Sequence, residues 1–278
     1  MEKEIFLAEL KNFVVNLKNK ISNGDEWTVR GFIDIFKNVY PISSDTKIIS
    51  KLLELHLFPH FLEFAKNNGF NLELAEYQNW YPDLTFISEK NPKIKFAVDL
   101  KTTYRDKNNS NFCNGFTLGS HGEYFIDRKS KKNIQYPYGD YSGHFCVGII
   151  YSREILDLSN ELQKFTIEDI EKIPAVIKNF LFFAEEKWKI ASDKSGSGNT
   201  ANIGSIKNIE DLISGRGVFS LAGEKFFDDY WANFGKLKIP DKNGVYKKLS
   251  SFEEFLKFKG LPEDLIYKPK SKKKRKDD

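Results

Sequence analysis

The segment WYPDLTFISEKNPKIKFAVDLKTTY, residues 80–104, decides the fold because it holds two strand-like runs in close succession. LTFIS at 84–88 and KFAVDLKT at 95–102 are rich in apolar and β-branched residues, and they flank the turn-like EKNP. Two such runs around a short polar turn are typical of a β-hairpin. We therefore expect residues 84–102 to form a pair of neighbouring strands.

The same segment carries acids and a lysine in a regular pattern. Asp83 is followed by fifteen residues, then by Asp99, and Lys101 comes two positions later. Because side chains alternate along a strand, Asp99 and Lys101 should lie on one face of theirs. The apolar residues that alternate with them toward the core are Ile94, Phe96, Val98 and Leu100.

This pattern indicates phosphodiester hydrolysis. Two carboxylates from adjacent strands can converge on Mg²⁺, which prefers oxygen ligands and usually retains several waters. A neighbouring lysine can orient or help deprotonate the attacking water, and it can offset charge that develops on the phosphoryl oxygens. The alternative is that Asp99 and Lys101 form an ordinary solvent-facing pair, since D-x-K occurs often by chance.

Two helices are expected before this hairpin. Residues 4–21 place apolar residues at helical spacing, and Asn-Gly follows as a stop signal. A second helix should begin near Ser44 or Asp45 and run to Pro59, with 61–66 helical beyond the break. Glu54 lies roughly opposite the apolar stripe of this helix, which is typical of a solvated surface glutamate. That stripe is centred on Ile48, Ile49, Leu52 and Leu55.

Downstream patterns complete an α/β fold. The apolar run at 144–152 predicts a buried strand, and 167–186 predicts helical pieces separated near Pro174. Because strands arrive in hairpins as well as after helices, we expect a mixed β-sheet flanked by helices. No internal repeat or linker divides the chain, so residues 1–260 are expected to form a single domain, followed by a basic, disordered tail at 268–278.

Composition excludes several classes of protein. The chain has 278 residues, of which 40% are hydrophobic, and it contains no uncharged apolar run long enough to cross a membrane. Its first residues include acids, unlike a secretory signal, so we expect a cytoplasmic protein. Cys113 and Cys146 are too few for a disulfide framework and lack zinc-site spacing. The net charge of +4 is weak evidence for a polyanionic partner.

The loop SGSGNTAN at 195–202 is glycine-rich and polar. It matches neither the P-loop nor the dinucleotide-binding motif. Its chemistry suits a DNA major groove, because glycine amides can approach guanine acceptors and an asparagine can bond adenine in bidentate fashion. A plain flexible loop remains the alternative on composition alone.

Several motifs, in order, resemble the EcoRV-like type II restriction endonucleases of the PD-(D/E)xK nuclease superfamily. They are SDTKIISKLLEL at 44–55, WYPDLTF at 80–86, VDLKTTY at 98–104, FTLGS at 116–120, NIQYPYGDY at 133–141, KWKIASD at 187–193, GSGNTANIGSI at 196–206 and GRGVF at 215–219. The resemblance covers roughly residues 40–235 and agrees with the mixed α/β fold.

The resemblance implies roles for individual residues. Asp83 and Asp99 match metal-binding carboxylates, Lys101 the catalytic lysine, and Glu54 a helix glutamate that assists the metal site. Residues in two loops, 75–80 and 195–202, and after the lysine become candidates for DNA contact: Gln78, Asn79, Thr102, Thr103, Gly196, Ser197, Gly198, Asn199, Thr200 and Asn202. The first loop departs from the family because it has one glutamine, and Ala201 stands where the family has threonine.

The implied function is Mg²⁺-dependent cleavage of double-stranded DNA at GATATC, leaving blunt ends with 5′-phosphates. A palindrome read by two identical loops requires a homodimer, whose contacts should include residues 28–41. A cognate DNA methyltransferase is expected in the same host. The alternatives are a repair or nicking nuclease without base discrimination, and a DNA-binding module without catalysis.

Overall fold

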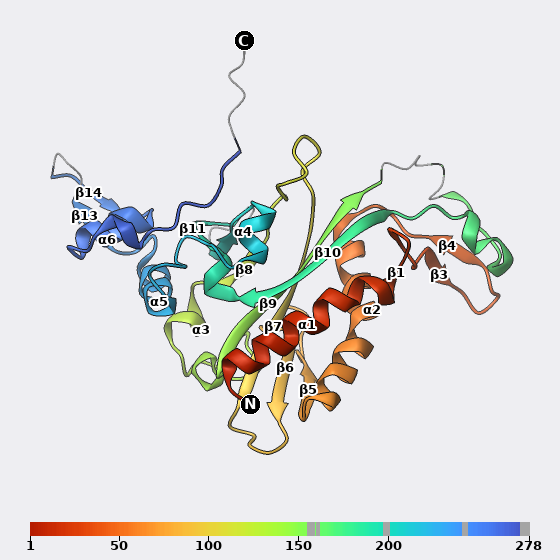
Figure 1. Ribbon diagram of the computed structural model, residues 1–278, viewed down its shortest axis with the longest axis horizontal. Coiled ribbons are helices and arrows are strands. Elements are labelled where there is room, and N and C mark those ends of the chain that lie inside the picture. The colour runs from red at the N-terminus through yellow and green to blue at the C-terminus, as the bar shows by residue number, and fades with distance from the viewer. Residues whose placement is uncertain (155–158, 160–161, 197–200, 241–243, 273–278) are drawn as a thin grey trace, which may run out of the picture.

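A seven-stranded mixed sheet forms the centre of the chain (Figure 1). The computed structural model describes residues 1–154, 159, 162–196, 201–240 and 244–272. The strands lie in the order β1 (Ser22–Asn23), β2 (Glu26–Trp27), β10 (Ile177–Glu186), β9 (Gly143–Arg153), β7 (Lys95–Tyr104), β6 (Leu84–Ser88) and β5 (Phe70–Leu74). All neighbours are antiparallel except β7 and β9, which are parallel. The expected mixed sheet is confirmed.

Strands β6 and β7 form the predicted hairpin. Phe86 pairs with Phe96 and Leu84 with Val98 across the hairpin. On its other side, β7 pairs in parallel with β9 along its length from Phe96 to Tyr104. The strand that carries the D-x-K pattern is therefore held on both edges.

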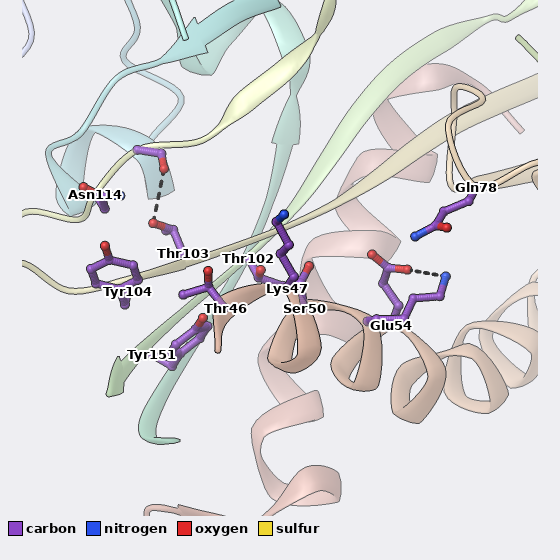
Figure 2. A pocket seen from close by; sticks show the side chains of 12 residues that line it. Thr46, Lys47, Ser50, Glu54, Gln78, Thr102, Thr103, Tyr104, Asn114 and Tyr151 are labelled. Atoms are coloured by element: carbon purple, nitrogen blue, oxygen red, sulfur yellow. Dashed lines mark hydrogen bonds and ion pairs between the residues drawn. The ribbon is translucent and has the colours of Figure 1, made fainter. Parts of the chain in front are cut away.

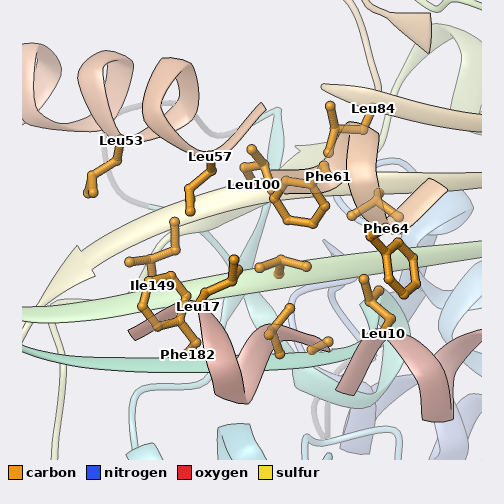
Figure 3. Packing of buried hydrophobic residues seen from close by; sticks show 14 of the residues in the cluster. Leu10, Leu17, Leu53, Leu57, Phe61, Phe64, Leu84, Leu100, Ile149 and Phe182 are labelled. Carbon is orange, nitrogen blue, oxygen red and sulfur yellow. The ribbon is translucent and has the colours of Figure 1, made fainter. Parts of the chain in front are cut away.

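Two long helices cover one face of this sheet. Helix α1 (Lys3–Ile21) packs mainly on β10, and α2 (Thr46–Asn67) packs on β5 and β7. Their apolar side chains meet those of the strands in one core (Figure 3). Residues of that core include Leu10, Leu17, Leu53, Leu57, Phe61, Phe64, Leu84, Leu100, Ile149 and Phe182. Asp45 caps α2 as expected, because its carboxylate accepts hydrogen bonds from the amides of Lys47 and Ile48.

Helix α2 differs from the sequence prediction in two respects. Its buried stripe runs through Ile49, Leu53 and Leu57, whereas the expected stripe residues Ile48 and Leu55 are 44% and 52% exposed. The expected centre of the apolar stripe is wrong, because apolar residues occur on more than one face of this helix and the sequence does not show which face is buried. Pro59 does not interrupt the helix, which continues to Asn67 because its residues after the proline, Phe61 and Phe64, are buried in the same core.

The prediction of helical pieces at 167–186 was wrong for its second half. Only Ile167–Lys172 is helical, as the 3-10 helix η3, and Ile177–Glu186 forms strand β10. Strand β10 lies inside the sheet between β2 and β9 and is largely buried on both faces. Without an alternation of polar and apolar residues, the run cannot be distinguished from a buried helix by pattern alone.

A second layer lies on the other face of the sheet, where Ala97, Cys146 and Phe183 enter a separate core. It contains a sheet in the order β11 (Ala191–Ser195), β12 (Asn202–Ser205) and β8 (Thr117–Ser120), and the pair β13 (Lys238–Pro240) and β14 (Tyr246–Lys248). Its helices are α3 (Glu123–Ile126), η1 (Tyr138–Asp140), η4 (Lys187–Ile190), α4 (Ile209–Ile213), α5 (Glu224–Asn233), α6 (Phe252–Phe258) and η5 (Glu263–Leu265). No helix in the described part of the chain is long and apolar enough to cross a membrane.

Two peripheral segments complete the structure. Strands β3 (Gly31–Ile33) and β4 (Val39–Pro41) form a hairpin at one end of the molecule (Figure 1). The first part of the predicted tail lies against the second layer and the loop after β7: Lys270 contacts Glu210, and Lys272 pairs with Asp106. The disorder expected of 268–278 stays a prediction, and 273–278 lie outside the described residues. The single-domain partition stays a prediction.

Candidate active site

Asp83, Asp99 and Lys101 meet at one edge of the β6–β7 hairpin, and we refer to them as the acid–lysine trio. The Lys101 Nζ atom lies 2.8 Å from Asp99 Oδ2 and 3.7 Å from Asp83 Oδ2. Asp83 stands just before β6, and its Oδ2 accepts a 2.7 Å hydrogen bond from the amide of Leu100 in the neighbouring strand. Hairpin pairing therefore brings together two acids that are separated by fifteen intervening residues.

Burial and mutual repulsion make this group of charges electrostatically unusual. Burial raises the pKa of the Asp83 carboxyl from 3.8 to about 7, and the negative charges of Asp99 and Glu54 act in the same direction. Burial alone would lower the pKa of Lys101, but the carboxylates of Asp99 and Asp83 outweigh it and raise that pKa. Lys101 is therefore held as an ammonium ion between the two acids. Strongly perturbed pKa values in a cleft are typical of functional sites.

The acid–lysine trio lines a cavity of about 460 Å³, which we call the acid cavity. Gln78, Asn79 and Asn202 line the same cavity. Three of the side chains predicted to contact DNA, which come from two loops far apart in the sequence, thus share one cavity with the predicted catalytic residues. A polymer that entered the acid cavity would contact the predicted DNA-binding side chains and the predicted catalytic residues at the same time.

Glu54 belongs to a neighbouring cavity of about 440 Å³, the helix cavity (Figure 2). Thr102 and Thr103 line this second cavity, and Gln78 lines both. The Glu54 side chain is 18% exposed and pairs with Lys51 at 2.9 Å. It is therefore not the freely solvated glutamate that the helical wheel predicted. The buried stripe of α2 is rotated from the expected position, and this rotation turns Glu54 toward the cavity.

The donor set suits a hard cation with few protein ligands. Asp83 and Asp99 supply carboxylate oxygens beside an open cavity, and Mg²⁺ is commonly held by one or two carboxylates together with waters. Among the residues that the structure describes, no three acidic, histidine or cysteine side chains are grouped to hold a metal ion. Glu54 lies in the neighbouring helix cavity, where its negative charge still acts on Asp83, and its place among the metal ligands stays a prediction.

The glycine-rich loop is described only at its ends. Ser197, Gly198, Asn199 and Thr200 lie outside the described residues. The amide of Gly196 donates a 2.9 Å hydrogen bond to the carbonyl of Asn202, which closes the base of the loop. A Cβ atom at Gly196 would lie 2.4 Å from Thr117 Cγ2, so close packing is sufficient reason for glycine there.

Sequence reasoning missed several side chains beside these cavities. Thr46 and Lys47, at the start of α2, line the helix cavity with Glu54. The available signal was the Asp45 cap, which places the next residues at a helix N-terminus where anions bind well. Tyr77 and Trp80 flank the tip of the 75–80 loop with ring centroids 4.7 Å apart. No motif in the sequence marked this aromatic pair.

Comparison with known proteins supports an assignment. Residues 23–260 match the family model described as restriction endonuclease EcoRV. The chain is also 35% identical over 232 residues to the type II restriction enzyme EcoRV of Escherichia coli, an alignment that covers 83% of this chain and 91% of that protein. The match extends beyond the motifs at 40–235 in both directions.

The raised pKa of Asp83 predicts a pH-dependent effect of Asp83→Asn on stability in the absence of metal. Between about pH 4 and pH 7 the folded state holds a proton that the unfolded state has lost, so wild-type stability falls as pH rises through this window. The stability of Asp83→Asn relative to wild type should therefore increase by on the order of 3 kcal/mol across it. Urea unfolding at pH 5 and pH 8 with a chelator measures this.

The exposed Glu89, on the turn of the same hairpin, provides the control. Glu89→Gln should show the same stability relative to wild type at both pH values. If Asp83→Asn showed an equally constant difference, Asp83 would be ionised throughout the range, and the effect assigned to burial would be refuted.

Proposed function

The chain belongs to the EcoRV family of type II restriction endonucleases, and from this premise we propose that it cleaves double-stranded DNA at GATATC with Mg²⁺. The products would be blunt ends that carry 5′-phosphates and 3′-hydroxyls. The observation that carries the proposal is the convergence of Asp83, Asp99 and Lys101 in one cavity with candidate DNA contacts. A cognate DNA methyltransferase in the same host would protect its own DNA.

In the proposed mechanism, Asp83 and Asp99 would hold Mg²⁺, which would lower the pKa of a bound water and offset negative charge on the phosphoryl group. Lys101 is kept cationic by the two acids, so its ammonium can stabilise the charge that builds on the scissile phosphate. It can also orient the attacking water. Glu54 lines the adjoining helix cavity, and we assign it a role in holding the metal or positioning water from the helix side.

Candidate DNA contacts surround these groups. Gln78 and Asn79 line the acid cavity, so a duplex whose scissile phosphate enters it would lie against them. Thr102 and Thr103 line the helix cavity beside the basic side chains Lys47 and Lys51. Hydroxyl and ammonium groups of this kind contact phosphates and set the register of a duplex. Base discrimination is assigned to the 196–202 loop.

A homodimer is supported by an apolar hairpin tip. The turn between β3 and β4 is held by Asp34, whose carboxylate accepts hydrogen bonds from the Phe36 amide, the Asn38 amide and the Tyr40 hydroxyl. The turn and the strand before it present apolar side chains that are more than half exposed: Phe32, Ile33, Ile35 and Phe36. Large exposed apolar patches mark interaction surfaces. A second copy of the chain fits the twofold symmetry of a palindromic site.

Digestion of a sequenced plasmid with Mg²⁺ tests the function. Every GATATC should be cut in both strands, and end mapping should give blunt ends with 5′-phosphates. A control digestion with a chelator should leave the plasmid intact. Cleavage at a different short palindrome would refute the assigned specificity, whereas nicks without preference would favour a repair or nicking nuclease.

The role of Lys101 in chemistry is tested by Lys101→Ala. Single-turnover cleavage should fall on the order of a hundredfold or more, because a charge aimed at the transition state is lost, while DNA binding with Ca²⁺ should change much less. Glu54→Ala should have a milder effect. Lys93→Ala, an exposed lysine on the same hairpin, is the matched control and should cleave normally. Equal losses of binding and cleavage in Lys101→Ala would instead make Lys101 a substrate-positioning contact.

Dimerisation through residues 28–41 predicts that Ile35→Asp converts the protein to a monomer. Ile35 is 90% exposed, and a carboxylate would be buried without a partner in the dimer contact. Val15→Asp, at a 67% exposed position on α1, should stay dimeric. Sedimentation velocity compares the three proteins. A dimeric Ile35→Asp at the same concentration would place the interface elsewhere.

A further inference from the structure

Lys187 is a buried cation that the proposed chemistry does not use. It stands at the start of η4, directly after β10, and only 3% of its surface is exposed. Within the described part of the chain, its Nζ atom is buried and has no hydrogen-bond partner. Burying an ammonium group without a hydrogen bond is costly, so its presence calls for a physical reason.

Aromatic rings take the place of hydrogen-bond acceptors around this ammonium group. The Nζ atom lies 4.9 Å from the ring centre of Tyr81, 5.2 Å from that of Tyr138 and 5.5 Å from that of Phe125. Rings at these distances attract a cation through their negative faces, and the attraction strengthens where water is excluded. Arg128 also lies over Tyr138, but it is ion-paired with Asp228.

Lys187 also lies close to the acid cavity. A Cβ atom added to Gly119, which lines that cavity, would be 3.6 Å from the Lys187 Nζ atom. Burial lowers the pKa of Lys187 to about 8, and the negative charge of Asp99 is the strongest influence that opposes this fall. The lysine is therefore linked electrostatically to one of the proposed metal ligands.

Tyr81 connects this lysine to the other proposed ligand. It precedes Pro82 and Asp83 in the chain. His144 Nε2 lies 3.2 Å from the carbonyl of Tyr138 and must donate to it, which leaves Nδ1 to accept from the Tyr81 hydroxyl at 2.9 Å. The Tyr81 ring is thus bonded at its hydroxyl and attracted at its face by a cation.

We propose that Lys187 is a positioning residue for the catalytic centre, which holds the Tyr81–Asp83 segment in place through the Tyr81 ring. The inference rests on the proposed function, because it requires that Asp83 take part in DNA cleavage. In this role Lys187, which is 3% exposed, acts from within the core and not by contact with DNA or metal. Its charge acts on the position of the Asp83 carboxylate relative to Asp99.

If Lys187 has this role, its replacement should lower cleavage activity without lowering the stability of the protein. A methionine fills nearly the same space as lysine without a charge to desolvate, and buried charges replaced by apolar groups often leave stability unchanged or increased. Lys187→Met should therefore have the wild-type Tm or a higher one. The cage formed by the rings of Tyr81, Phe125 and Tyr138 would lose the attraction that fixes Tyr81. A small displacement of a reacting group lowers turnover on the order of tenfold to a hundredfold.

Lys189→Met is the matched control. Lys189 lies on the same short helix, but it is 32% exposed and ion-paired with Glu186 at 2.6 Å. Removal of this partnered charge should lower Tm slightly and leave turnover unchanged. Lys187→Met should thus lower turnover without lowering Tm, whereas Lys189→Met should lower Tm slightly without changing turnover. Each variant replaces a lysine of η4 with methionine.

The experiment measures Tm, single-turnover cleavage with Mg²⁺ and DNA binding with Ca²⁺ for wild type, Lys187→Met and Lys189→Met. The expected result is a cleavage defect in Lys187→Met alone, with unchanged binding and no loss of Tm. If Lys187→Met cleaves like wild type, or if it loses Tm or fails to fold, the proposal is overturned. A wild-type protein without cleavage would refute the proposed function instead.

A double-mutant cycle with Tyr81→Leu tests the route of the effect. If Lys187 acts through the Tyr81 ring, the double variant should cleave no more slowly than Tyr81→Leu alone, because the ring that transmits the effect is already absent. Independent, multiplying losses of cleavage rate would show that Lys187 does not act through Tyr81 and would overturn this part of the inference.

Discussion

Strand β7 pairs with β6 on one edge and with β9 on the other. The register of these two pairings decides which side chains of β7 enter the core and which face the opposite side, and the rest of the structure depends on this choice. In this register Phe96, Val98 and Leu100 enter the core beneath the long helices. Alternation then directs Asp99 and Lys101 to the opposite face. A slip of one residue would exchange the two sets, burying charges under the helices and exposing apolar side chains. The same packing that stabilises the sheet therefore positions the chemistry.

The two faces of the central sheet have different roles, one in stability and the other in forming the candidate active site. One face is covered by α1 and α2 and is almost entirely apolar, which provides the stability of the fold. The other face carries a second hydrophobic core, and the buried polar residues His144 and Lys187 lie on this side of the sheet. Buried charges contribute little net stability themselves, because each charge must be desolvated. The surrounding apolar side chains give a low-dielectric environment in which a few fixed charges act strongly on a phosphate.

The balance of charge in the acid–lysine trio illustrates this environment. Two carboxylates and one ammonium group leave one negative charge, in a place where burial already raises the pKa of Asp83. A divalent cation would relieve the repulsion between the acids, and Lys101 would then be free to face the substrate. The ordered hairpin thus presents two acidic side chains whose charge a single lysine only partly compensates.

The sequence by itself determined the local features. Hydrophobic periodicity, residue propensities and turn residues predicted these features, because each depends on near neighbours in the chain. The features are the β6–β7 hairpin, both long helices, the Asp45 cap and the strand at 144–152. The acid–lysine trio was predictable for the same reason, since its three members lie on one hairpin. The motifs also pointed to the family, which the comparisons confirmed.

Only the tertiary structure decided features that depend on distant partners. Strand β10 is buried on both faces, so its pattern alone could not distinguish it from a helix. Glu54 turned out to face a cavity because packing against the sheet selects which apolar side of α2 is buried. The cage around Lys187 joins rings from positions 81, 125 and 138, and such a cluster has no signature along the chain. Contacts between segments that are remote in the sequence form only when the whole chain folds, so a local sequence pattern cannot predict them.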